Sequence, residues 1–176
     1  MLKVRATADT RLDRTDAGNL ALLAELTNGD LRYVTETSSW LFWNEGRWQV
    51  DAAGLAAQSQ SLRVAEFYYA KGAEMREKAS DPTHDDKERK AIAKAADNLD
   101  KWAVHCRNRS ALVNMQGLAK CDARFAVSIL DLDQDPWLFG AENGVVDLRT
   151  GQLQDAGRDA FVTRRAPVAF DAGASA

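Results

Sequence analysis

The chain has 176 residues, of which 45% are hydrophobic and 28% are charged, and its formal net charge is −3. A chain of this length can bury a core without disulfides or metals, and its acidic balance argues against a generally basic nucleic-acid binder. Two cysteines, no apolar leader and no run near the roughly 20 apolar residues that span a bilayer predict a cytoplasmic protein with no membrane partner.

Residues 1–52 are predicted to form a helix followed by a small β-meander. Thr15 or Asp16 can cap the first turn, leucines then recur at helical spacing, and Asn28-Gly29 ends the helix. Apolar residues then recur at every second position, which predicts three short strands, at residues 31–34, 40–43 and 47–50.

Residues 53–125 are predicted to form a helical bundle. Apolar residues recur every three or four positions, and Pro82 interrupts the pattern because proline cannot continue a helix. Three helices are expected, over residues 55–79, 85–106 and 110–120. Short connections between them favour antiparallel packing.

Residues 126–176 are predicted to be β-rich, with short apolar runs at 137–139, 145–148 and 161–163 separated by turns. We expect this segment to form one compact unit with residues 1–52, with residues 31–50 and 137–170 packing together as one small sheet. The predicted fold class is therefore α+β, with a central helical bundle flanked by short antiparallel strands from the N- and C-terminal parts.

One tract in the last segment is unusual. It begins Asp131-Leu132-Asp133-Gln134-Asp135-Pro136-Trp137-Leu138 and continues, after three residues and Glu142, as Asn143-Gly144-Val145-Val146-Asp147-Leu148-Arg149-Thr150-Gly151. Physically, Asp-Pro begins a turn, Trp137 anchors a strand in a core, and Asn143-Gly144 turns the chain back into a return strand. We call residues 131–151 the hallmark tract.

The hallmark tract resembles a motif of phage and plasmid DNA primase–helicases, which lies just upstream of a superfamily III helicase domain and is shared with poxvirus and satellite-phage relatives. Further segments are similar to the same domain, at residues 15–19, 31–34, 40–48 and 163–171. The resemblance thus spans about residues 14–171. It implies a replication protein of phage, plasmid or prophage origin, with NTPase activity in the parent, primase and helicase modules as partners, and ring-forming self-association.

The departures from the parent protein limit what these residues can do. No Gly-x-x-x-x-Gly-Lys-Ser/Thr loop occurs, so no phosphate-binding loop of an ATPase is present in the sequence. The ATPase and primase activities are therefore not expected here, and the sequence is expected to be an excised domain or a truncated remnant. We predict no catalytic residues, no metal and no cofactor.

Other constellations have ordinary explanations. One such constellation is the alternation of Asp131, Asp133 and Asp135, whose carboxylates could bind a divalent ion. The glycine and the distal glutamate of an EF-hand calcium loop are missing, which favours a solvated turn. Cys106 and Cys121 lie on different predicted helices without the close pairing typical of zinc sites. No Gly-x-Ser-x-Gly elbow supports a hydrolase.

Basic residues offer the main functional signal. Between residues 87 and 124 the sequence has nine Lys and Arg against four Asp and Glu, a local excess of five positive charges. Four lysines recur at spacings of three, four and seven, so they share one helix face opposite the apolar stripe. This face is either a solvated surface or a contact for single-stranded or primer-template DNA. The candidate DNA-binding residues are Lys87, Lys90, Lys94, Lys101, Arg107, Arg109, Arg149, Arg164 and Arg165.

The tryptophans provide a second, weaker signal, because aromatic rings can stack on single-stranded bases. We expect Trp43, Trp102 and Trp137 in the core, and Trp40 and Trp48 are candidate stacking residues. The leading hypothesis is a non-catalytic accessory domain of a primase–helicase that positions DNA or supports assembly. The alternatives are a structural collar that contacts only protein and, less favoured, an unrelated small enzyme.

Overall fold

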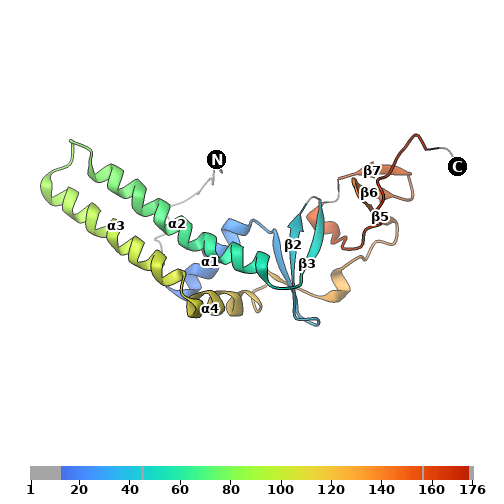
Figure 1. Ribbon diagram of the computed structural model, residues 1–176, viewed down its shortest axis with the longest axis horizontal. Coiled ribbons are helices and arrows are strands. Elements are labelled where there is room, and N and C mark those ends of the chain that lie inside the picture. The colour runs from blue at the N-terminus through green and yellow to red at the C-terminus, as the bar shows by residue number, and fades with distance from the viewer. Residues whose placement is uncertain (1–12, 45, 156, 175–176) are drawn as a thin grey trace. The chain divides into compact units, whose positions relative to one another are not determined.

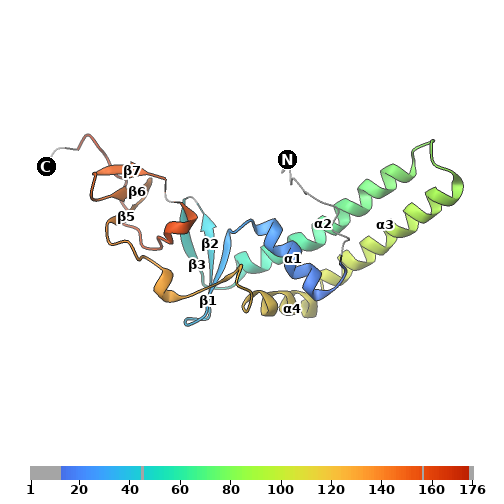
Figure 2. The same ribbon diagram turned by 180° about the vertical axis from the view of Figure 1, so that it is seen from behind.

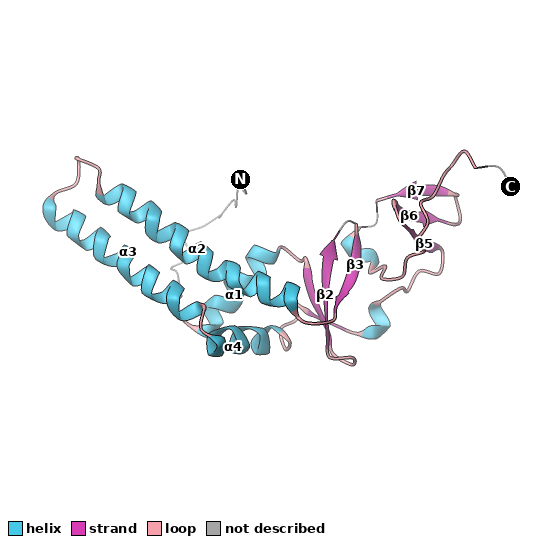
Figure 3. Ribbon diagram, in the orientation of Figure 1, coloured by secondary structure: helices cyan, strands magenta, loops and turns pink. Residues whose placement is uncertain are grey.

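The computed structural model describes residues 13–44, 46–155 and 157–174. Helices and short strands segregate along the chain (Figures 1 and 3), which confirms the predicted α+β class. The chain divides into two compact units. The helical unit contains the described residues up to Asn28 and Ala57–Ala119, and the β-rich unit contains Gly29–Ala56 and the residues from Lys120 onward.

The helical unit contains α1 (Asp16–Thr27), most of α2 (Leu55–Ala79), α3 (Asp86–Cys106) and α4 (Arg109–Ala119). Helices α2 and α3 run antiparallel and side by side in both views (Figures 1 and 2), and α1 packs against α4. These boundaries agree with the predicted helices to within one or two residues. None of the described helices is both long and apolar enough to cross a membrane.

Local signals explain where these helices begin and end. The Thr15 side chain accepts a hydrogen bond from the Gly18 N–H, and Asn28 ends α1 in the left-handed region with φ of 47°. Asp85 and Glu88 form a reciprocal capping box at the start of α3. Capping side chains therefore satisfy backbone groups that the helices themselves leave unpaired.

A buried polar residue connects α1 to α3 in the helical unit. Asn19 is fully buried, and its side-chain oxygen accepts a hydrogen bond from the Trp102 indole N–H at 3.1 Å. The Asn19 amide nitrogen lies 3.4 Å from the Cys106 sulfur. Burial raises the pKa of the Cys106 thiol to about 11, so the thiol is neutral at physiological pH. This group explains why α1 belongs to the helical unit and not, as expected, to one unit with the strands that follow it.

The first sheet of the β-rich unit has the strand order β3-β2-β1-β4. The meander of β1 (Leu31–Val34), β2 (Ser39–Asn44) and β3 (Arg47–Asp51) is antiparallel, and the short β4 (Ala126–Val127) pairs parallel with β1. Trp43 and Trp48 lie opposite each other across β2 and β3. The aromatic residues of the predicted meander thus become cross-strand neighbours.

The second sheet contains β5 (Leu138–Ala141), β6 (Gly144–Asp147) and β7 (Gln152–Gln154) in that order, all antiparallel. The expectation of one shared sheet is therefore wrong for the described residues. The hairpin that turns at Asn143-Gly144 pairs with the following segment, which was not predicted as a strand, instead of with the meander. The strand expected at 161–163 is also not formed, because Phe161 adopts a left-handed conformation with φ of 45° after a short 3-10 helix, Arg158–Ala160.

Side chains link the two sheets within this unit. Trp48 is 1% exposed and packs with Val34 and Leu41, while its ring stacks on Phe161 with centroids 5.7 Å apart. Trp43 packs against this cluster and also against a second cluster centred on Val145 and Val162. The core of the β-rich unit is therefore continuous across both sheets.

Candidate nucleic-acid interface

Four lysines of α3 form one exposed face, which we call the lysine face: Lys87, Lys90, Lys94 and Lys101. At about 100° per residue, these positions fall within about 60° of arc around the helix. The buried residues Ala96, Leu99 and Ala103 lie on the opposite side. The helix therefore orients its lysines away from the core of the helical unit.

The acidic residues near the lysine face are engaged elsewhere. The Arg76 guanidinium of α2 forms ion pairs with Asp97 and Asp100, and hydrogen bonding to Asp100 raises the pKa of Arg76. Glu88 belongs to the capping box, where its carboxylate accepts a hydrogen bond from the Asp85 N–H at 3.0 Å.

Farther along the chain, Arg124 pairs with Asp122 at 2.8 Å, and its hydrogen bonds lower the pKa of Asp122 to about 2. The four acids of this basic stretch are thus occupied by other groups. Within the described part of the chain, by contrast, none of the four lysines pairs with a carboxylate. The positive charge of the face is consequently not neutralised locally.

Two predicted arginines lie at the end of the same helix. Arg107 is the C-cap of α3 and Arg109 begins α4, and both side chains are exposed. Beside Lys101, a hollow of about 650 Å³ is lined by Asp13, Arg14, Asn98, Lys101, Trp102 and His105. Arg14, Asn98 and His105 were not predicted as site residues. The helical spacing of Asn98 and His105 from Lys101, three and four positions, was a signal that could have identified them.

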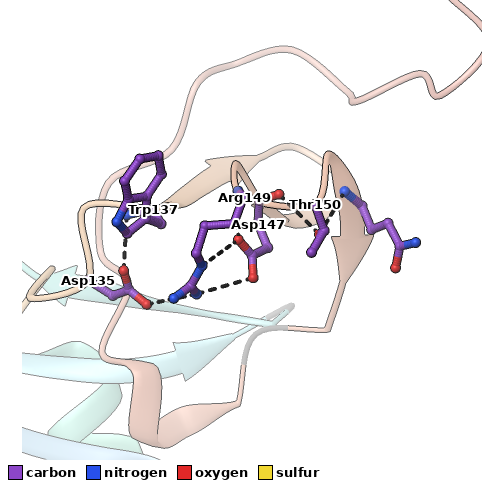
Figure 4. A network of polar contacts seen from close by, with 6 residues as sticks. Asp135, Trp137, Asp147, Arg149 and Thr150 are labelled. Atoms are coloured by element: carbon purple, nitrogen blue, oxygen red, sulfur yellow. Dashed lines mark hydrogen bonds and ion pairs between the residues drawn. The ribbon is translucent and has the colours of Figure 1, made fainter.

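The remaining predicted arginines belong to the β-rich unit. Arg149 lies between two carboxylates of the hallmark tract (Figure 4), 3.2 Å from Asp135 and 2.9 Å from Asp147. These bonds lower the pKa of Asp147 and raise that of Arg149. Arg149 thus closes a turn within the hallmark tract, and its charge is already paired with two carboxylates before any phosphate binds.

Arg164 and Arg165 differ from Arg149. The Arg164 side chain is 92% exposed and lies 3.8 Å from Asp133, a loose pair that a ligand could replace. Arg165 donates a hydrogen bond to the Glu142 carbonyl oxygen at 3.3 Å. Of the three predicted DNA-binding arginines in this unit, Arg164 therefore has the most accessible charge.

The alternating aspartates of the hallmark tract bind other parts of the chain. Asp131 caps a short 3-10 helix by accepting from the Ser128 N–H at 2.9 Å. Asp133 accepts from the Thr163 N–H at 2.7 Å and from the Thr163 hydroxyl at 2.6 Å. Asp135 accepts from the Trp137 N–H at 3.0 Å. Among the described residues, no group of three or more His, Cys, Asp and Glu side chains is placed to hold a metal ion.

The same tract holds the segment 163–170 at several points. Besides the Asp133 bonds to Thr163, the Ala166 N–H donates to the Gly140 carbonyl oxygen at 2.9 Å. The Asn143 side chain exchanges two hydrogen bonds with the Phe170 backbone, at 2.8 and 3.0 Å. The polar residues of the hallmark tract thus serve the folding of the β-rich unit.

The tryptophans differ from expectation at three positions. Trp40 and Trp48 are 6% and 1% exposed, and the Trp48 indole N–H donates to the Arg158 carbonyl oxygen at 2.9 Å. Their ring faces are therefore not available to stack on bases. Trp137, expected in the core, is 50% exposed, because the turn at Asp135 directs it outward beside Leu148.

Comparison with known proteins agrees with this architecture. The family model described as "D5 N terminal like" matches residues 21–176, which include the meander, α2 to α4 and the whole hallmark tract. No curated protein matches the chain. The chain therefore belongs to the D5-like N-terminal family, which comprises the N-terminal domains of D5-like primase–helicases.

Proposed function

We propose that this domain is a non-catalytic accessory domain that positions DNA beside the ATPase motor of a replicative primase–helicase, with the lysine face of α3 as the DNA contact. The observation that carries the proposal is the set of four exposed lysines on one face that lack carboxylate partners within the described residues. Unpaired ammonium groups on a rigid helix suit phosphate oxygens, because no internal ion pair must break first.

The geometry fits a contact along the nucleic-acid backbone. Lys87 and Lys101 are separated by fourteen helical positions, which corresponds to about 21 Å. This length covers about six phosphates of one strand of a duplex. Lysine contacts of this kind position nucleic acid without reading its sequence. The domain would thus guide DNA and leave the chemistry to other modules of the parent protein.

The prediction is tested by fluorescence anisotropy with labelled single-stranded, duplex and primer-template DNA. If each of the four lysines contacts one phosphate of a single strand, the logarithm of affinity should fall with the logarithm of salt with a slope of about −2.8. Affinity should then drop about 50-fold between about 50 and about 200 mM salt. ATP hydrolysis by this chain should be absent.

The decisive variant neutralises Lys90, Lys94 and Lys101 to glutamine. Its slope should fall to about −0.7, which corresponds to about a threefold loss over the same salt range. Lys78→Gln is a matched control, because Lys78 is an exposed lysine of α2 outside the lysine face. Equal salt slopes for the triple variant and the unaltered protein would exclude the lysine face as the contact.

A second candidate function, a collar that contacts only protein, is favoured by an apolar surface of the second sheet. Phe139 and Leu153 are exposed cross-strand neighbours on either side of the buried Val146, and Trp137 and Leu148, which share a backbone hydrogen bond two residues along the same hairpin, are also exposed. Exposed apolar groups gathered on one face are typical of protein interfaces. Analytical ultracentrifugation of the unaltered protein and of Phe139→Ser tests self-association through this face, and a monomer at all concentrations would count against ring formation by this domain alone.

A further inference from the structure

The hollow beside Lys101 combines an aromatic surface with two cations. It is lined by Asp13 and Arg14, which precede α1, and by four residues of α3: Asn98, Lys101, Trp102 and His105. Its volume is about 650 Å³, and it is open to solvent over much of its boundary, so it would hold a ligand against one face. The residues come from two separate stretches of the helical unit, so the hollow exists only in the folded protein.

The aromatic part of the hollow is fixed in place. The Trp102 indole N–H is bound to the buried Asn19, so the polar edge of the ring points into the core. The His105 ring stacks on Trp102 with centroids 4.6 Å apart and an interplanar angle of 27°. His105 itself is exposed, while Trp102 is half-buried. A planar ligand could therefore stack on one face of the His105 ring, whose other face already stacks on Trp102.

The cationic side chains of the hollow are available to bind an anionic ligand. Within the described residues, neither the Lys101 ammonium nor the Arg14 guanidinium pairs with a carboxylate, although Asp13 lies in the same lining. The Asp13 backbone oxygen accepts a hydrogen bond from the Tyr68 hydroxyl at 3.3 Å, which anchors this stretch to α2. Asn98 adds an amide that can both donate and accept.

We propose that the hollow binds one unpaired nucleotide of a single strand, with its phosphate at Lys101 and Arg14 and its base stacked on His105. An aromatic platform beside cations is the usual chemistry of single-strand recognition, since every base has a ring face and every nucleotide a phosphate. Asn98 and Asp13 can bond to polar atoms at the edge of the base. The inference rests on the proposed function, because Lys101 belongs to both the hollow and the lysine face. It adds a preference to that function: the DNA contacts of α3 should favour single strands over duplex.

The chain contains two histidines, which provides an internal control. His105 lines the hollow, whereas His84 lies between α2 and α3 and sits 3.7 Å from Glu88. Carbon–proton NMR spectra of the imidazole rings, recorded while thymidine 5′-monophosphate is added, should show shifts for His105 and not for His84. Equal shifts of both rings, or no shift of His105, would overturn the assignment.

Affinity measurements separate this inference from the proposed function. His105→Ala should weaken single-strand binding about 5- to 150-fold, which is the range for loss of one stacked base, while duplex affinity and the salt slope stay unchanged. Lys90→Gln should weaken single strands and duplex alike and reduce the salt slope by about 0.7 to 0.9. If His105→Ala affects both substrates equally, or neither, the hollow is not a nucleotide site even when the lysine face binds DNA. If the lysine variants have no effect and His105→Ala does, the proposed lysine contact fails and the hollow remains the binding site.

Discussion

Asp133 offers the sharpest test of a structural role for the hallmark tract. Its carboxylate accepts hydrogen bonds from the Thr163 N–H and hydroxyl, and its own backbone has a φ of 52°, in the left-handed region. Asp133→Asn keeps one acceptor and a residue type that tolerates this conformation, so it should cost about 1 kcal/mol. Asp133→Ala loses both acceptors and adds backbone strain, which together should cost about 3 kcal/mol.

Thermal denaturation followed by near-ultraviolet circular dichroism measures this difference, because Trp43 and Trp48 report on the β-rich unit. For a chain of this size, the alanine variant should melt about 6 to 12 °C lower and the asparagine variant about 2 to 4 °C lower. Magnesium or calcium should leave all three melting curves unchanged. A melting temperature that rises with divalent ions in the unaltered protein, and not in Asp133→Asn, would refute the reasoning and restore the metal hypothesis.

Three further substitutions test other parts of the two units. Asn19→Ala should destabilise the helical unit by about 1 to 3 kcal/mol, measured by urea unfolding, because the buried Trp102 N–H loses its acceptor; an unchanged midpoint would mean that water replaces the amide. Gly140→Ala should disrupt the β-rich unit, since the added methyl group would overlap the Arg164 carbonyl oxygen, and limited proteolysis should then cleave between 155 and 170 faster than in a Gly157→Ala control. Hydrogen bonding from the Ser128 hydroxyl lowers the pKa of Glu36 from 4.5 to about 2, so the stabilisation that its charge provides is present above pH 4.5 and lost as the pH falls toward 2. The stability difference between the unaltered protein and Glu36→Gln should accordingly shrink between pH 4.5 and 2 in denaturant titrations, and a constant difference would contradict the shifted pKa.

The helices could be predicted almost to the residue because their signals are local. Thr15, Asn28 and the capping box at Asp85 each act on backbone groups within three or four positions. The meander could be predicted for the same reason, since its alternating apolar residues and its turn residues lie close together in the sequence.

Long-range pairing could not be predicted in this way. Whether the hairpin of the hallmark tract joins the meander or pairs with Gln152–Gln154 depends on contacts between distant segments, for which short strands carry little specific information. The same limit explains why the burial of the tryptophans could not be predicted from the sequence. Trp48 and Trp137 both lie in short segments expected to be strands, and contacts with distant residues distinguish the two rings, because Trp48 packs with Val34, Leu41 and Phe161.

The candidate site likewise has one part that could be predicted from the sequence and one part that could not. The shared face of Lys87, Lys90, Lys94 and Lys101 follows from helical spacing alone. The hollow does not, because it requires Arg14, from before α1, to lie beside α3. Asn19 contributes to this arrangement as a buried amide that an apolar pattern does not reveal.

The attachments between the hallmark tract and residues 163–170 have a mechanical consequence. Asp133, Gly140 and Asn143 bind this segment at three successive points, and Glu142 adds a bond to the Val168 carbonyl oxygen at 2.9 Å. A pulling force applied at Phe170 is therefore shared among attachments along this segment, and the share that each one carries depends on the direction of the pull. The segment would consequently transmit a load to the hairpin at several places along its length and not at its end alone.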